Sequence, residues 1–194
     1  PPALRAIVAD PECVVDGFLA AGHVCAITGT REYVDLAARE HVPLVVTGFE
    51  PLDILHGILL CVQQLEAGRA EVEIPYARAV RTEGNPSAQA LLREVFTVVP
   101  QRWRGLGEID ASGLGIAPAY ADFDAVRRFN LDPRAATTDP TREECQSGRV
   151  LIGRIKPPEC PHFGTRCTPE TPLGATMVSS EGACAAYFRY RRSA

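Results

Sequence analysis

Residues 42–58 read VPLVVTGFEPLDILHGI, and this stretch decides the fold class of the 194-residue chain. Its first part, Val42 to Thr47, is apolar and rich in β-branched residues, which favours a buried strand. The strand stops at Gly48, and a helix begins near Pro51, because proline is favoured in the first helical turn. We therefore predict a strand followed directly by a helix from about Leu52 to Ala67.

The same alternation of strand and helix continues on both sides of this stretch. We expect two further helices, at Arg31–Glu40 and Ser87–Phe96, and three further strands, at His23–Gly29, Glu71–Val80 and Val95–Val99. Strands joined by short helices form parallel sheets, because a parallel pair needs a crossover connection. The sequence predicts an α/β domain over residues 1–135, with an open parallel sheet and helices on both faces.

Side-chain periodicity and capping residues refine these helices. Thr30 and Asn85 stand where helix N-caps are expected, and Gly68 stands where a C-terminal cap is expected. The helix after Pro51 carries a wide apolar face, formed by Leu52, Leu55, Leu59, Val62 and Leu65. In the helix after Asn85, the side chains expected on the inner side are Leu91, Leu92 and Val95.

Bulk composition excludes some classes of protein. The net charge of −4 argues against a general nucleic-acid binder, which usually carries a basic excess. No apolar run reaches the roughly 18 residues that a membrane span needs. The seven cysteines are odd in number and four of them lie in the tail, unlike the even and dispersed framework of a secreted disulfide protein. We expect a cytoplasmic protein that binds neither nucleic acid nor membranes.

The strand–helix rhythm ends after Pro100, where glycines and a polar segment mark loops. A short helix or turn is expected at Tyr120–Phe129, and Asp132–Thr141 reads as a linker. Residues 136–194 then form a small loop-rich lobe with four cysteines in the pattern C-x14-C-x6-C-x16-C, at Cys145, Cys160, Cys167 and Cys184. Proline and glycine between them favour turns over long regular elements.

Four thiols gathered by loops can serve as disulfides, as buried side chains, as a structural zinc site or as ligands of an iron–sulfur cluster. Zinc ribbons usually pair their ligands as C-x2-C, which this spacing lacks. Thiolates are the usual ligands of iron–sulfur clusters, and Cys160-Pro161 has the Cys-Pro step of ferredoxin-type runs. The absence of any C-x-x-C argues against a thiol oxidoreductase that acts alone.

The tail PPECPHFGTRCTPETPLGATMVSSEGACAAYFRY, from Pro157 to Tyr190, resembles the C-terminal signature of the hydrogenase formation protein family HypD. The stretches VPLVVTGFEPLDILHGI and WRGLGEIDASGL, the latter from Trp103 to Leu114, resemble the same family in the same order. The resemblance covers essentially the whole chain. Family members are about twice as long, and the CGxHxH-like and GPGCPVC-like motifs of their N-terminal half are absent here. The chain therefore resembles the C-terminal half of a HypD.

The resemblance implies a site and partners. In the family, cysteines in this pattern ligate one [4Fe–4S] cluster, which assigns Cys145, Cys160, Cys167 and Cys184 as ligands. HypD works with HypC and HypE to assemble the Fe(CN)2CO unit that is later inserted into [NiFe]-hydrogenase. The iron unit would be held by the missing half, so the resemblance implies a redox-active assembly scaffold rather than a stand-alone enzyme. The alternative is a structural zinc-binding α/β module that docks partners.

Other candidate residues flank these motifs. Cys184 is expected in the first turn of a helix opened by Ser179 or Ser180. Glu181, three residues before that cysteine, is a tentative proton or hydrogen-bond partner near the active cleft, or a helix N-terminal charge. Glu50 and Asp53 follow a strand at the head of a helix, where open α/β sheets place ligand sites, although an acidic cap is the simpler interpretation. His162 is not expected to be a ligand.

A further set of side chains is given structural roles by the sequence. Cys25 and Cys61 lie in apolar contexts and are expected to be core thiols. Arg189, Arg191 and Arg192 follow the last predicted helix, where basic residues oppose the negative end of the helix dipole, and contact with a partner is the alternative.

Overall fold

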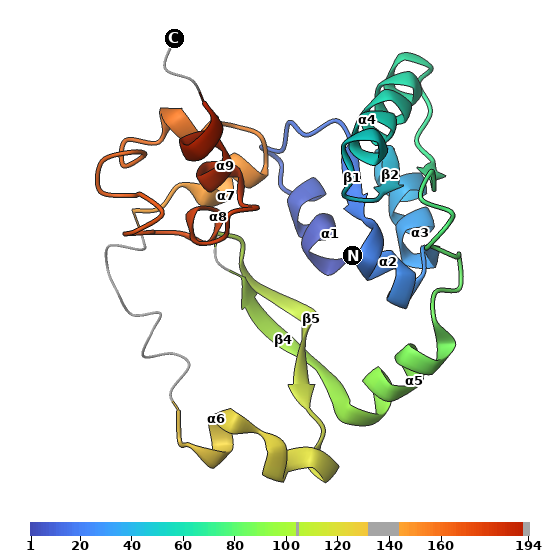
Figure 1. Cartoon of the computed structure of the whole chain (residues 1–194), viewed down its shortest axis with the longest axis vertical. Coiled ribbons are helices and arrows are strands. Elements are labelled where there is room, and N and C mark those ends of the chain that lie inside the picture. Colours follow the sequence, from blue (N-terminus) through green and yellow to red (C-terminus); the bar gives the residue numbers. More distant parts are fainter. Residues whose placement is uncertain (104, 132–143, 192–194) are drawn as a thin grey trace. The chain divides into compact units, whose positions relative to one another are not determined.

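A computed structural model describes residues 1–103, 105–131 and 144–191 of the chain, which divides into two compact units (Figure 1). The first unit comprises Pro1 and Val15–Phe96, and the second comprises Pro2–Val14 and Thr97–Ala194. The predicted linker at Asp132–Thr141 and the predicted boundary near residue 135 lie outside the described residues. None of the described helices combines the length and the apolar character needed to cross a membrane.

A parallel sheet organises the first unit. Its strands are β1 (Phe18–Ala21), β2 (Leu44–Thr47) and β3 (Val72–Glu73), in the order β1-β2-β3, with Phe18 opposite Leu44 and Leu44 opposite Val72. The helices of this unit are α2 (Gly22–Thr28), α3 (Arg31–Glu40), α4 (Pro51–Glu66) and α5 (Pro86–Val95). The predicted α/β class is confirmed.

The buried core residues of this unit lie mainly in β2 and α3. All four residues of β2 are buried, as expected for a central parallel strand covered by helices. The predicted face of α3 is confirmed, since Tyr33, Leu36 and Ala37 are buried while the other residues of the helix are exposed.

Local signals fixed the limits of the longer helices. Pro51 is the first residue of α4, and Gly68 follows its C-terminus with a φ of 63°, a left-handed conformation that glycine adopts without strain. The Asn85 side chain accepts a hydrogen bond from the Ala88 N–H at 3.1 Å and caps α5. Thr30 occupies the N-cap of α3 without a side-chain hydrogen bond.

The apolar faces of α4 and α5 do not form the core. The sheet-facing side of α4 has Gly57 and Gln64 as its buried residues, whereas its large apolar side chains are exposed. A Cβ at Gly57 would lie 3.1 Å from the Thr47 side chain, so the glycine lets α4 approach β2 closely. No residue of α5 is buried, and the prediction that Leu91 lies on an inner side is wrong.

Two predicted strands are corrected. The strand is Phe18–Ala21, which pairs with β2. His23–Gly29 lies largely in the following helix α2, whose buried residues Gly22 and Cys25 are three positions apart, a helical spacing. The strand predicted at Glu71–Val80 is reduced to Val72–Glu73. Pro75 follows directly and cannot donate a ladder hydrogen bond.

The second unit contains a separate two-stranded sheet, made of β4 (Phe96–Trp103) and β5 (Gly107–Ile116). The strand predicted at Val95–Val99 exists but pairs with β5 rather than joining the parallel sheet. Of the glycines predicted to mark loops, Gly105 lies in a turn, whereas Gly107, Gly113 and Gly115 lie within β5. A Cβ at Gly113 would collide with the Gln101 side chain of β4. Helix α1 (Pro2–Val8) packs against β5.

The remainder of the second unit consists of short helical segments. The predicted turn at Tyr120–Phe129 is confirmed as η1 (Pro118–Phe123) and α6 (Ala125–Arg128). The tail contains α7 (Ser147–Leu151), η4 (Pro157–Glu159), α8 (Ala175–Val178) and α9 (Ala183–Tyr190). Its buried cluster is small and consists of Cys167, Met177, Cys184 and Ala185.

The contrast between Leu36 and Leu91 provides a test of this core. Leu36 is 1% exposed in α3 and Leu91 is 61% exposed in α5. We expect Leu36→Ala to lower the free energy of unfolding by about 2–5 kcal/mol, because it leaves a cavity. Leu91→Ala should change it by less than about 0.5 kcal/mol. Urea unfolding followed by circular dichroism measures both, and equal losses would contradict the core described above.

Candidate metal centre

All four tail cysteines line one cavity in the second unit. The cavity wall is formed by Cys145, Cys160, Cys167 and Cys184 together with Gln146, Ser147, Val150, Phe163, Gly174, Thr176 and Met177. The ligands predicted from separate loops are therefore brought to one place. The seven cysteines, all within the described residues, are free thiols.

Short elements position each sulfur. Cys145 stands two residues before α7, and Cys160 directly follows η4, whose Pro157 is favoured at the first helical position. Cys184 lies in the first turn of α9, as predicted, but the N-cap is Gly182 rather than Ser179 or Ser180.

A hydrogen-bonded loop joins Cys160 to Cys167. The Phe163 N–H donates to the Cys160 carbonyl at 3.0 Å, and the Cys167 N–H donates to the His162 carbonyl at 2.9 Å. Gly164 has a φ of 72° and donates to the Cys167 carbonyl at 3.0 Å, so the turn needs a residue that tolerates the left-handed region. The Phe163 ring packs edge to face on Phe188 of α9, which ties this loop to the helix that carries Cys184.

The sulfur atoms receive hydrogen bonds from their surroundings. The Thr176 hydroxyl donates to the Cys184 sulfur at 3.0 Å, and the Leu173 N–H donates to the Cys167 sulfur at 3.5 Å. Gly174 lies against Cys145 so closely that a Cβ at this position would collide with the sulfur. Such groups are typical of sites where the protein tunes the charge on sulfur ligands.

Burial shifts the pKa of one of the four thiols. Burial raises the pKa of the Cys184 thiol, the hydrogen bond from Thr176 partly opposes this shift, and the neighbouring cysteines raise the pKa further. A metal binds the thiolate, so metal binding here must displace protons. In the described part of the chain, no group of three or more His, Cys, Asp or Glu side chains is gathered as a single metal ion requires. The four sulfurs instead surround the cavity.

Two tail residues singled out from the sequence lie outside the cavity wall. Glu181 is exposed and precedes the N-cap of α9, with its backbone N–H bonded to the Ser179 hydroxyl at 3.2 Å. His162 places Nε2 3.4 Å from a carboxylate oxygen of Glu144 and does not line the cavity. Thr176 was not identified from the sequence. It lies eight residues before Cys184, and no sequence pattern at this spacing indicates that its hydroxyl contacts the sulfur.

The arginines after the last predicted helix are only partly described. Arg189 lies in the last turn of α9, with its guanidinium 6.0 Å from the centre of the Tyr190 ring, and Arg191 is the C-cap residue. Arg192 lies outside the described residues.

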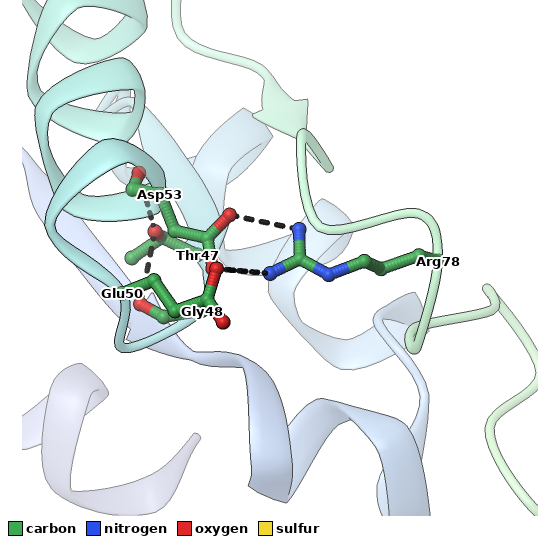
Figure 2. Close-up of polar contacts among 5 residues, drawn as sticks. All are labelled: Thr47, Gly48, Glu50, Asp53 and Arg78. Carbon is green, nitrogen blue, oxygen red and sulfur yellow. Dashed lines mark hydrogen bonds and ion pairs between the residues drawn. The ribbon is translucent and has the colours of Figure 1, made fainter.

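The first unit holds a cluster of polar side chains at the carboxyl end of β2 (Figure 2). Arg78 donates two hydrogen bonds to the Asp53 carboxylate, at 2.8 and 2.6 Å, and lies 3.5 Å from Glu50. The Thr47 hydroxyl donates to the Asp53 carbonyl at 2.8 Å and fixes the first turn of α4 to the strand. The arginine guanidinium also lies 4.3 Å from the centre of the Tyr76 ring.

The geometry of this cluster indicates an ion pair that ties α4 to the segment after β3. The Asp53 side chain is 14% exposed, whereas that of Glu50 is 79% exposed and makes only the long contact. Hydrogen bonds from Arg78 hold the pKa of Asp53 below its usual range. Glu50 is placed at the head of a helix as predicted, and its tentative catalytic role stays a prediction.

The remaining cysteines are more ordinary. Cys25 is fully buried in α2, and burial raises the pKa of its thiol, which confirms a core position. Burial also raises the pKa of the adjacent Tyr33 to about 12. Cys61 is only partly buried on α4, and Cys13 is likewise partly buried.

Comparison with known proteins gives a consistent result. The family model described as "HypD: Hydrogenase formation hypA family" matches residues 1–191. Proteins named hydrogenase maturation factor HypD are similar to the chain: one from Escherichia coli (strain K12) is 47% identical over 192 residues, and one from Rhodobacter capsulatus is 47% identical over 194 residues. Each alignment covers 98% of this chain and 51% of the relative, so the chain spans about half the length of the curated relatives it matches.

The Asp53–Arg78 pair gives a pH-dependent prediction. The pKa of Asp53 is lowered in the folded state, so its contribution to stability is present above the ordinary Asp pKa of about 3.9 and is lost as pH falls through the lower folded-state value. We expect Asp53→Asn to be less stable than the wild type at pH 7, with the difference shrinking below about pH 4. Thermal melts from pH 7 to pH 2 measure this difference.

Glu50→Gln is the matched control, since it alters an exposed carboxylate near the same guanidinium. It should change stability little at any pH. A difference between the wild type and Asp53→Asn that stays constant across the pH range would contradict the assignment of the pKa shift to this pair.

Proposed function

The chain belongs to the HypD family of hydrogenase formation proteins, and on this premise we propose that it is the cluster-binding part of a [NiFe]-hydrogenase maturation factor. The observation that carries this proposal is the convergence of Cys145, Cys160, Cys167 and Cys184 on one cavity. Four thiolates are the usual ligand set of a [4Fe–4S] cluster.

The surroundings of the sulfurs fit such a group. The cavity wall is otherwise largely apolar, with Val150, Phe163 and Met177 contributing to it, which limits access of water. The Leu173 N–H and the Thr176 hydroxyl are directed at two of the sulfurs. Because Gly174 has no side chain, the Cys145 sulfur can lie directly against the Gly174 backbone.

These residues would hold and tune the cluster. The four thiolates would bind its irons, and the two hydrogen bonds would stabilise negative charge on Cys167 and Cys184. A bound cluster would accept and donate single electrons. The apolar wall raises the energetic cost of a change in charge, so it also helps to set the reduction potential.

The role of the whole protein extends this proposal. The family resemblance implies a redox-active scaffold that works in the cytoplasm with HypC and HypE to assemble the Fe(CN)2CO unit. Because the chain spans about half the length of its relatives, we place the groups that hold this iron unit in the other half. The chain then supplies electrons and does not complete the reaction by itself.

A zinc-stabilised interaction module is the second candidate, because four thiolates are also a structural zinc set. A single zinc ion requires four sulfurs about 2.3 Å from one point. The sulfurs that surround this cavity would have to move inward to meet that requirement. Metal analysis separates the two candidates.

We expect protein purified without oxygen to be brown, to absorb near 400 nm and to contain about four iron and four sulfide per chain, as the cluster stoichiometry requires. Cys167→Ala should lose the iron, since it removes one ligand, and should also melt at lower temperature because the tail has a small core. Iron and sulfide assays with a visible spectrum measure these effects.

Cys61→Ala is the matched control, because this cysteine belongs to α4 in the first unit and is not one of the residues that line the cavity. It should retain iron at the wild-type level. Colourless protein with one zinc per chain would favour the interaction module, and unchanged iron content in Cys167→Ala would refute the ligand assignment.

The hydrogen bond from Thr176 should affect the cluster potential rather than its assembly. Thr176→Val keeps the side-chain shape but removes the donor to Cys184. We expect near-normal iron content and a lower reduction potential, since the donor stabilises the more negative reduced state. Redox titration followed by visible or electron paramagnetic resonance spectra measures the shift. Thr165→Val is the control, and an equal shift in both variants would contradict a role for this hydrogen bond.

A further inference from the structure

Helix α4 presents its large apolar side chains away from the sheet. Seven of them are between 38% and 79% exposed: Leu52, Ile54, Leu55, Ile58, Leu59, Val62 and Leu65. At the 100° per residue of an α-helix they cover a continuous band of roughly 160° around the axis. The buried side of the helix is occupied instead by Gly57 and Gln64. Protein surfaces normally expose large apolar residues singly, so seven neighbouring apolar side chains form an unusually large exposed apolar surface.

The sheet beside this helix has an open edge. Strand β1 is the first in the sheet order and pairs only with β2 among the described residues. The Phe18 N–H donates to the Pro43 carbonyl at 3.0 Å, and backbone groups alternate in direction along a strand. The N–H and C=O of Leu19 therefore point away from β2, toward the outer edge. Unpaired edges of this kind are normally covered or paired.

The two exposed features are neighbours within the first unit. Helix α4 packs on both β1 and β2. A Cβ at Gly57 would lie 3.4 Å from Cδ2 of Leu19, so the sheet-facing side of α4 meets the edge strand directly. We call the α4 apolar band together with the β1 edge the α4–β1 surface. A partner that added a strand to β1 would also be placed to contact α4.

The length of the relatives identifies the occupant. The alignments cover 98% of this chain but 51% of the relatives from Escherichia coli and Rhodobacter capsulatus. A full-length member therefore has about as many residues again. The sheet is entirely parallel, and parallel strands arise within one chain through crossover connections. A two-fold dimer would instead pair β1 with its symmetry copy in the antiparallel sense.

We propose that the half of the full-length protein outside this sequence docks on the α4–β1 surface, pairing a further strand with β1 and covering the apolar band of α4. The other half then completes the sheet of the first unit and is not merely joined to it by a linker. This inference does not depend on the metal bound in the tail.

Charge insertion on the band tests the proposal in the full-length protein. Leu55 is 63% exposed on α4, and Val34 is 49% exposed on the charged face of α3. We expect Leu55→Asp to lower the melting temperature of the full-length protein by about 5 °C or more, because it buries a charge at an interface. In the 194-residue chain, the same change should shift it by less than about 2 °C. Val34→Asp should be near neutral in both.

Hydrogen exchange tests the edge without any substitution. In the full-length wild type, the Leu19 amide should exchange about 100-fold or more slowly than an exposed loop amide, as expected for a paired strand. The Val45 amide of the central strand is the internal reference. Loop-like exchange at Leu19 would overturn the proposal.

Two further outcomes would also overturn it. Equal destabilisation by Leu55→Asp in the short and full-length proteins would mean that the chain covers its own α4 band. A full-length dimer that Leu55→Asp separates into monomers, measured by light scattering, would assign the surface to a second copy. A loss of stability confined to the full-length monomer, with a protected Leu19 amide, supports the proposal.

Discussion

Part of the cysteine set that lines the cavity also belongs to the buried core of the tail. Two of the four residues in its buried cluster, Cys167 and Cys184, are proposed ligands, and the others are Met177 and Ala185. Packing and metal binding therefore act on the same atoms. Burial raises the pKa of the Cys184 thiol, so a metal that bound this sulfur would have to displace its proton. The energy of the proposed metal binding would then become part of the stability of the tail.

Much of the architecture could be predicted where the signal is local. Pro51, Gly68 and Asn85 fixed helix ends because their backbone preferences act within a few residues. Strands were less predictable, because a strand exists through its partner. The apolar residues at His23–Gly29 suit a strand, yet Phe18–Ala21 takes the place beside β2. Strand β5 was missed for the same reason, since its glycines resemble loop residues until β4 lies beside them.

The candidate site shows the same division. Family resemblance supplied the four cysteines, and the structure brings them together around one cavity. Residues that act on the ligands were not predictable, because Thr176 and Leu173 reach the sulfurs only through the fold of the tail. Arg78 likewise meets Asp53 across a sequence separation of 25 residues. The periodicity of α4 correctly indicated an apolar face but carried no information about which neighbour that face contacts.

The glycine beside Cys145 has a consequence for how the site responds to mutation. A Cβ at Gly174 would take the space of the sulfur, so every other amino acid at this position displaces a proposed ligand. The position is therefore sensitive to substitution, although it contributes no side chain to the cavity. A random substitution at Gly174 would therefore also disturb the position of the Cys145 sulfur. The genetic target presented by the proposed metal centre would be larger than its set of four sulfurs.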